Sequence, residues 1–134
     1  MAWRDWTDAA GRASRAGVDV VQAPSLLYLD HAHGSDEGEP LSIGRGATLE
    51  EVYAYDPYAG LSDASHLLGL QAQLWSEYIP TAEHLWYMAF PRLVAMADVG
   101  WYGADRPPYE DFRAGLPARL ADLADLGIGH RPLG

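Results

Sequence analysis

The chain has 134 residues, nine arginines, nineteen acidic residues, no lysine and no cysteine, which give it a formal net charge of -10. This is the length of one domain. Because phosphate recognition draws on clustered basic side chains and these arginines are scattered singly, the composition argues against nucleic acid and anionic membranes as partners. The lack of cysteine removes disulfides, thiolate nucleophiles and cysteine-based zinc sites.

Targeting signals are not visible in the sequence. No apolar run reaches about 18 residues, so we expect no transmembrane helix. The first seventeen residues lack the basic and then apolar layout of a signal peptide. These observations leave the cellular location undetermined. Five tryptophans, eight tyrosines and two phenylalanines indicate a folded protein whose aromatic side chains build a core or line a pocket.

The N-terminal third predicts a helix, a strand and a loop. Trp3 and Trp6 stand at near-helical spacing in residues 3–16, and Gly17 is a natural stop. The β-branched run 18–24 ends in proline and predicts a buried parallel strand, which residues 25–30 extend. Residues 31–46 are rich in Gly, Asp, Glu and Pro and predict a surface loop.

A short helix and a second strand are expected next. Thr48 opens a T-x-x-E capping box, which predicts a helix that Asp56 and the following proline bring to an end. The apolar run 66–75 has the length of a strand. Strands separated by helices imply parallel pairing in an α/β sheet.

Two helices complete the prediction. Residues 81–101 are too long and apolar for a strand and predict a largely buried helix, which Pro91 kinks near Tyr87. Residues 107–127 place apolar side chains three and four apart and end at a glycine suited to a C-terminal cap. Trp101 is expected to pack within this helical part. Two strands alone cannot make a stable parallel sheet, so the pattern suggests an incomplete domain or a missing partner.

Each predicted strand ends with an aromatic residue followed two positions later by a carboxylate: Tyr28 with Asp30, and Trp75 with Glu77. Residues i and i+2 of an extended chain point to the same side, at the sheet edge where ligands bind. An aromatic face covers the C–H patch of a sugar ring, and a carboxylate accepts hydrogen bonds from its hydroxyls. The pattern favours a carbohydrate site, although strand-end carboxylates also serve as helix caps.

Longer motifs carry a resemblance to a known family. Residues 68–101, LGLQAQLWSEYIPTAEHLWYMAFPRLVAMADVGW, resemble the end of the catalytic barrel of glycoside hydrolase family 20, the β-N-acetylhexosaminidases. That family has a G-x-Q-x-x-L-W-x-E strand followed by a P-R-x-x-A-x-A-E helix. Upstream, Tyr28 to Asp30 is similar to its Y-L-D strand end, and Tyr53 to Pro57 to its Y-x-Y-x-P helix. The resemblance covers roughly residues 17–131.

The resemblance implies a fold and four substrate-binding residues. It makes residues 1–134 a C-terminal part of a (β/α)8 TIM barrel, with about the last two strands, their helices and a terminal helix. Tyr28 would donate to the 2-acetamido oxygen of the sugar, and Asp30 would bind hydroxyls at the far rim. Trp75 would stack beneath the ring, and Glu77 would accept from the 4-hydroxyl side.

The implied reaction is substrate-assisted retaining hydrolysis of terminal non-reducing N-acetylhexosamine, without cofactor or metal. The family's catalytic Asp-Glu pair is absent from a suitable position. The only such dipeptide, Asp36-Glu37, lies in a polar loop where nothing would desolvate the acid. We therefore expect no catalytic residue in this chain and no activity of the chain alone. Trp3 or Trp6 matches a further pocket tryptophan loosely, and Asp98 stands where the family has Glu.

Other interpretations remain open. His31 and His33 with nearby acids could be metal ligands, but the string lacks the spacing of zinc motifs, so no metal site is expected. The chain could instead be a non-catalytic N-acetylhexosamine-binding module, a partner subunit or a truncated inactive product. The expected partners are an N-acetylhexosamine glycoside and the rest of the barrel. Gluco or galacto preference, linkage, export and oligomeric state are not decided by the sequence.

Overall fold

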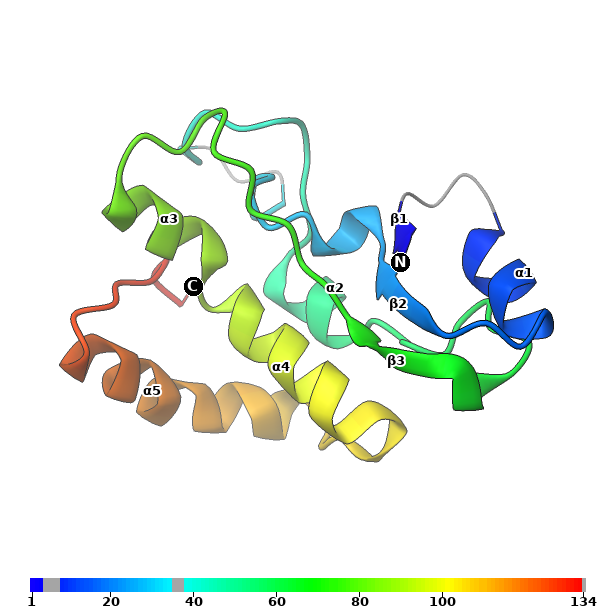
Figure 1. The fold of residues 1–134 in the computed structure, drawn as a ribbon. Coiled ribbons are helices and arrows are strands. Elements are labelled where there is room, and N and C mark those ends of the chain that lie inside the picture. The colour runs from blue at the N-terminus through cyan, green and yellow to red at the C-terminus, as the bar shows by residue number, and fades with distance from the viewer. Residues whose placement is uncertain (4–7, 35–37, 134) are drawn as a thin grey trace.

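The molecule contains a three-stranded parallel sheet. The computed structural model describes residues 1–3, 8–34 and 38–133 (Figure 1). The strands are β1 (Ala2–Trp3), β2 (Val20–Ala23) and β3 (Leu67–Leu70), in the order β1-β2-β3. Ala2 pairs with Gln22, and Val20 pairs with Leu67, in parallel register. The expected parallel pairing is confirmed, with one strand more than expected.

The extra strand lies where the sequence predicts a helix. Residues 3–16 do not form one helix, because Ala2–Trp3 pairs with β2 and α1 (Ala9–Arg15) begins later. A two-residue strand is too short to show period-two alternation, so the near-helical tryptophan spacing misled the prediction. Gly17 does end the helix, with a positive φ of 72° and its N–H donated to the Ser14 carbonyl.

Both predicted strands are shorter in the structure. Residues 25–30 do not extend β2, since Ser25–Leu27 forms a 3-10 turn, η1, after Pro24. Likewise β3 follows a 3-10 turn, η2 (Ala64–His66), and ends at Leu70 instead of reaching residue 75. The proline at the end of β2 has no N–H for the ladder, which favours a change of backbone direction there.

The helix predicted over residues 81–101 is two helices. It is divided into α3 (Ala82–Ala89) and α4 (Arg92–Tyr102), with Phe90 in extended conformation between them. Pro91 causes the break, because it lacks an N–H and disfavours helical backbone at the residue before it. The predicted kink is therefore wrong, because the helix is interrupted here and not merely bent. A 3-10 turn, η3 (Gly103–Asp105), follows α4.

The last helix and the capping box are confirmed. The helix α5 (Tyr109–Asp125) runs through Pro117, which lies on its exposed side where water can reach the unpaired carbonyl. The helix α2 (Leu49–Tyr53) begins at Thr48, whose N–H donates to Glu51 Oε2 at 2.8 Å while its hydroxyl accepts the Glu51 N–H. Both hydrogen bonds of this N-terminal cap join residues three positions apart, so the sequence alone predicts them.

The hydrophobic core lies where α2, α4 and α5 meet the segment that follows β2. The Tyr53 and Phe112 rings stack at 4.3 Å, and Ala95 of α4 is fully buried beside them. Other buried core residues are Leu27, Leu29, Ala47, Val52, Leu116 and Leu120. Figure 1 shows α5 beside α4. Leu27 and Leu29 fix the strand-end segment to these helices.

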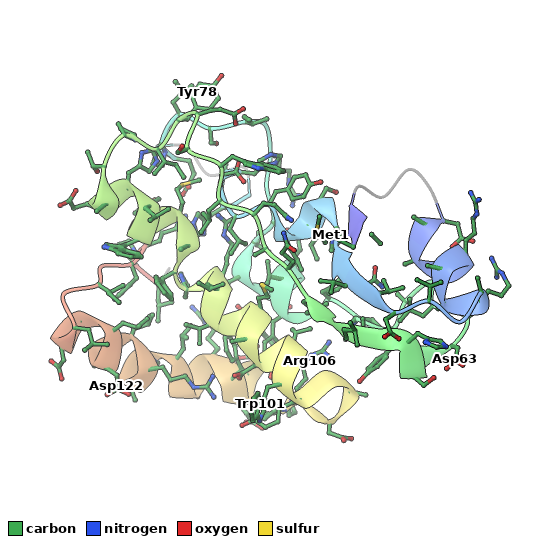
Figure 2. The ribbon with its side chains drawn as sticks, viewed as in Figure 1. Met1, Asp63, Tyr78, Trp101, Arg106 and Asp122 are labelled. Carbon is green, nitrogen blue, oxygen red and sulfur yellow. The ribbon has the colours of Figure 1, made fainter. Side chains whose placement is uncertain are left out.

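Trp101 lies at the far end of α4 from that segment (Figure 2). It is 84% exposed, so the described residues of this chain do not provide the packing expected for it. None of the helices in the described ranges is long and apolar enough to cross a membrane.

Candidate functional site

The segments that leave β2 and β3 lie side by side beyond the sheet. Tyr28 forms a parallel bridge with Gln73. The Leu29 N–H donates to the Gln73 carbonyl at 2.8 Å, and the Gln73 N–H donates to the Leu27 carbonyl at 3.1 Å. These hydrogen bonds continue the pairing after both strands have ended. They place the two predicted aromatic and acidic pairs next to each other.

The aromatic members of the two pairs are in contact. The Tyr28 and Trp75 rings meet edge to face, with centroids 4.9 Å apart, and the His31 ring meets Tyr28 in the same way with centroids 5.5 Å apart. Tyr28 is buried, whereas Trp75 is 37% exposed. The indole therefore keeps a surface that a flat ligand can cover, while Tyr28 holds it from the side.

Asp30 is the buried carboxylate of the group, at 5% exposure. Burial and the nearby Glu77 carboxylate raise the pKa of Asp30. Hydrogen bonds from the backbone N–H groups of Asp30 and Trp75, and the neighbouring His31, lower it, but the net pKa is raised. Oδ1 accepts no hydrogen bond from the described residues. A buried acceptor without a donor is costly unless a ligand supplies one.

The structure thus brings together all four predicted sugar-binding residues. Leu29, between Tyr28 and Asp30, is fully buried in the core and anchors this segment there. Glu77 is exposed and close enough to Asp30 to affect its pKa. The segment then continues to Tyr78, at the outer end of the connection to α3 (Figure 2).

A buried arginine contacts the backbone on both sides of Asp30. Arg92, the first residue of α4, is 0% exposed. Its guanidinium donates to the carbonyls of Leu29, His31 and Ala32, which flank Asp30 on both sides. Sequence reasoning missed these contacts, although Arg92 stands in the stretch compared with the P-R-x-x-A-x-A-E motif.

A second polar cluster joins the loop after the site to α3 and to the C-terminal segment. The His33 Nε2–H donates to the Tyr87 carbonyl at 3.1 Å, since a carbonyl can only accept. Burial and the Arg92 charge lower the pKa of His33 to about 3, so this imidazole is neutral. Glu39 accepts from Arg131 Nε at 2.7 Å and from the Tyr87 hydroxyl at 3.2 Å. Sequence gave no signal for this cluster.

The two histidines considered as metal ligands have separate partners. His31 packs against Tyr28, and His33 binds a backbone carbonyl. Within residues 1–3, 8–34 and 38–133, no three His, Cys, Asp or Glu side chains come together in a group that could hold a metal ion.

Some sequence candidates lie outside what the structure describes. Asp36-Glu37 and Trp6 are in the undescribed ranges, and of Trp3 only the backbone is placed. Their functions stay predictions.

Two cavities lie away from the strand ends. One of about 380 Å³ is lined by His33, Thr48, Arg113 and Arg131, and another of about 540 Å³ by Tyr53, Tyr58, Arg106 and Tyr109. The aromatic and acidic cluster forms an open site, in which Trp75 and Glu77 are exposed.

Comparison with known proteins identifies the family of the chain. Residues 1–104 match the model of the catalytic domain of glycosyl hydrolase family 20. The chain belongs to glycoside hydrolase family 20. The match includes β1 and all four residues of the open site, and it begins earlier than the motif resemblance at residue 17.

Two curated relatives are similar over most of the chain. A β-hexosaminidase of Porphyromonas gingivalis is 39% identical over 99% of this chain and 18% of its own length. An N,N'-diacetylchitobiase of Vibrio harveyi is 38% identical over 84% of this chain and 16% of its own length. The chain therefore spans less than a fifth of either relative.

Solved family 20 structures have the same arrangement of elements. The β-N-acetylhexosaminidase of Streptomyces coelicolor A3(2) superposes with a TM-score of 0.81, 27% identity and coverage of 98% of this chain and 28% of that one. A Vibrio harveyi exo-β-N-acetylglucosaminidase in complex with N-acetylglucosamine gives a TM-score of 0.82 and 31% identity, over 96% of this chain and 21% of that one.

Proposed function

We propose that this chain contributes part of the sugar pocket of a β-N-acetylhexosaminidase, which removes terminal non-reducing N-acetylhexosamine by substrate-assisted retaining hydrolysis. Residues 1–134 would form part of a (β/α)8 barrel, with β1, β2 and β3 as three of its strands. The observation that carries the proposal is the convergence of Tyr28, Asp30, Trp75 and Glu77 at one edge of a parallel sheet in a family 20 chain.

Each residue has a chemistry suited to one part of an N-acetylhexosamine ring. The exposed Trp75 face would cover the C–H surface of the ring. Asp30, buried and with an unfilled acceptor, would take hydroxyl donors, and Glu77 would do so at the more open side. Tyr28 would donate its phenol hydrogen to the acetamide oxygen, which attacks the anomeric carbon in this mechanism.

The acid and the acetamide-orienting carboxylate would come from residues outside this chain. In the chain, Asp36-Glu37 stands in a polar segment that does not follow an apolar strand. A general acid at neutral pH needs a raised pKa, which requires desolvation. We therefore propose that the 134-residue chain alone does not turn over substrate. A non-catalytic binding module is less favoured, because the relatives are named as hydrolases.

The test is a hybrid enzyme. Residues 1–134 replace the matching segment of the Porphyromonas gingivalis β-hexosaminidase, and turnover of 4-nitrophenyl N-acetyl-β-D-glucosaminide is measured. We expect activity, which Asp30→Asn reduces in kcat/KM by about 10- to 100-fold, the effect of losing a charge-assisted hydrogen bond. Trp75→Ala should also reduce it, whereas Trp101→Ala, at the far end of α4, should not.

Two results would contradict the proposal. One is a folded hybrid without turnover, or one in which Trp75→Ala and Trp101→Ala behave alike. The other is turnover by the isolated chain that Glu37→Gln abolishes, which would place the acid in the segment where we do not expect it.

A further inference from the structure

The guanidinium of Arg92 joins four parts of the chain. Nη1 lies 3.1 Å from the Ala32 carbonyl and 3.0 Å from the Ala47 carbonyl, which precedes α2. Nη2 lies 2.7 Å from the Leu29 carbonyl and 2.9 Å from the His31 carbonyl. It also lies 2.8 Å from the Met88 carbonyl in the last turn of α3. Three of the five acceptors thus belong to residues 29–32.

These contacts fix the backbone on which Asp30 stands. The Leu29 carbonyl belongs to the peptide group that joins Leu29 to Asp30, so a hydrogen bond to it sets the plane of that group. On the other side, the Leu29 N–H is held by the Gln73 carbonyl of the neighbouring segment. The direction of the Asp30 side chain therefore depends on Arg92 and on the pairing with the segment after β3.

Only an arginine side chain suits this position. Its planar group presents donors in several fixed directions, whereas a lysine ammonium is a compact point charge with three donors. Arg92 is wholly buried, and burial lowers its pKa to about 10, partly opposed by the Glu39 and Asp30 carboxylates. It stays protonated at neutral pH, and backbone carbonyl dipoles surround the charge.

We propose that Arg92 is a positioning residue for the sugar site: it holds residues 29–32 in the shape that presents Tyr28 and Asp30 to the ligand. The inference rests on the proposed function, because it assigns Arg92 an effect on that same site. Arg92 touches no substrate and acts through the backbone. The simpler alternative is that Arg92 only stabilises the fold.

The first experiment does not depend on enzymatic activity. Hydrogen–deuterium exchange is measured on the 134-residue chain and on two variants, Arg92→Lys and Arg119→Lys. Arg119 pairs with Asp98 between α5 and α4 and does not contact the site, so it is the matched control. We expect Arg92→Lys to speed exchange of residues 27–33 by about tenfold or more beyond any change in α5, because several buried acceptors lose their donors. Equal acceleration throughout the chain, or none at residues 27–33, would overturn the proposal.

The second experiment uses the hybrid enzyme and a double-mutant cycle. Arg92→Lys should lower kcat/KM about tenfold or more, and little further when Asp30→Asn is already present, because both changes remove the same interaction. Losses that multiply would mean that Arg92 does not act through Asp30. A folded but inactive parent hybrid would refute the proposed function, while the exchange experiment would still decide whether Arg92 sets the shape of residues 27–33.

Discussion

The ion pair between Glu39 and Arg131 should be a main attachment of the C-terminal segment. The Glu39 side chain is 8% exposed and accepts from Arg131 Nε at 2.7 Å, from the Tyr87 hydroxyl at 3.2 Å and from the His33 N–H at 3.4 Å. Glu39 uses Oε1 for Arg131 and Tyr87 and Oε2 for the His33 N–H, whereas Glu39→Gln has a single acceptor oxygen and no charge to face Arg131. The loss is therefore at least one charge-assisted hydrogen bond, about 2 kcal/mol of unfolding free energy.

This loss should have a defined pH dependence. Burial raises the pKa of Glu39, but the hydrogen bonds from Arg131 and the His33 N–H, together with the Arg131 charge, outweigh it, and the net pKa is lowered. A carboxyl with a lowered folded pKa contributes stability above its unfolded pKa of about 4.3 and loses it as pH falls through the folded value. The difference between wild type and Glu39→Gln should thus be full at pH 7 and shrink below about pH 4.3.

The assay is urea unfolding followed by tryptophan fluorescence at several pH values, with Asp122→Asn as the control for loss of an exposed acid on α5. In thermal unfolding, the same 2 kcal/mol loss corresponds to a melting temperature lower by roughly 5–8 °C in a chain of this size. The reasoning fails if Glu39→Gln costs no more than Asp122→Asn at pH 7. It also fails if the difference stays constant from pH 7 to below the unfolded pKa.

Four further changes test the site, the loop beside it and the helices α4 and α5. Asp30→Asn should raise the melting temperature at pH 7 while it lowers N-acetylglucosamine affinity in the hybrid enzyme. The raised pKa means that the ionised acid costs stability, increasingly as pH rises through its folded pKa; equal stability of both forms at pH 7 would contradict this. Gly46→Ala should destabilise by about 1–3 kcal/mol in urea unfolding, because its Cβ would meet the Ala32 carbonyl, while Gly115→Ala has open space in α5 and should stabilise by about 0.5–1 kcal/mol. Asp98→Asn should cost about 1 kcal/mol in the same assay through its ion pair with α5, and an unchanged urea midpoint would show that this pair contributes nothing.

Local signals explain the part of the fold that sequence predicts well. The capping box at Thr48, the apolar spacing of α5 and the glycine after each of α1 and α5 all involve residues within four positions of one another. The prediction fails where a short strand or a 3-10 turn is decided by distant partners. The two-residue strand β1 is defined by its pairing with β2, about twenty positions later in the chain. The 3-10 turn η1 forms where an extension of β2 was expected.

The candidate site shows the same division between local and distant information. Spacing alone places Tyr28 with Asp30 and Trp75 with Glu77, and parallel pairing then brings the two pairs together, as the Tyr28 and Trp75 contact shows. The support could not be predicted in this way. Arg92 reaches carbonyls about sixty positions away, and Glu39 pairs with a residue 92 positions later.

The break at Pro91 connects these distant parts. Pro91 has no N–H to donate to the Tyr87 carbonyl, and the end of α3 leaves further carbonyls unpaired within the helix. The Tyr87 carbonyl accepts from His33, the Met88 carbonyl accepts from Arg92, and the Phe90 carbonyl accepts the Arg131 N–H at 3.1 Å. The same groups that a continuous helix would have used internally therefore hold the strand-end loop and the C-terminal segment. The backbone that carries Tyr28 and Asp30 is therefore held by contacts within the described part of the chain.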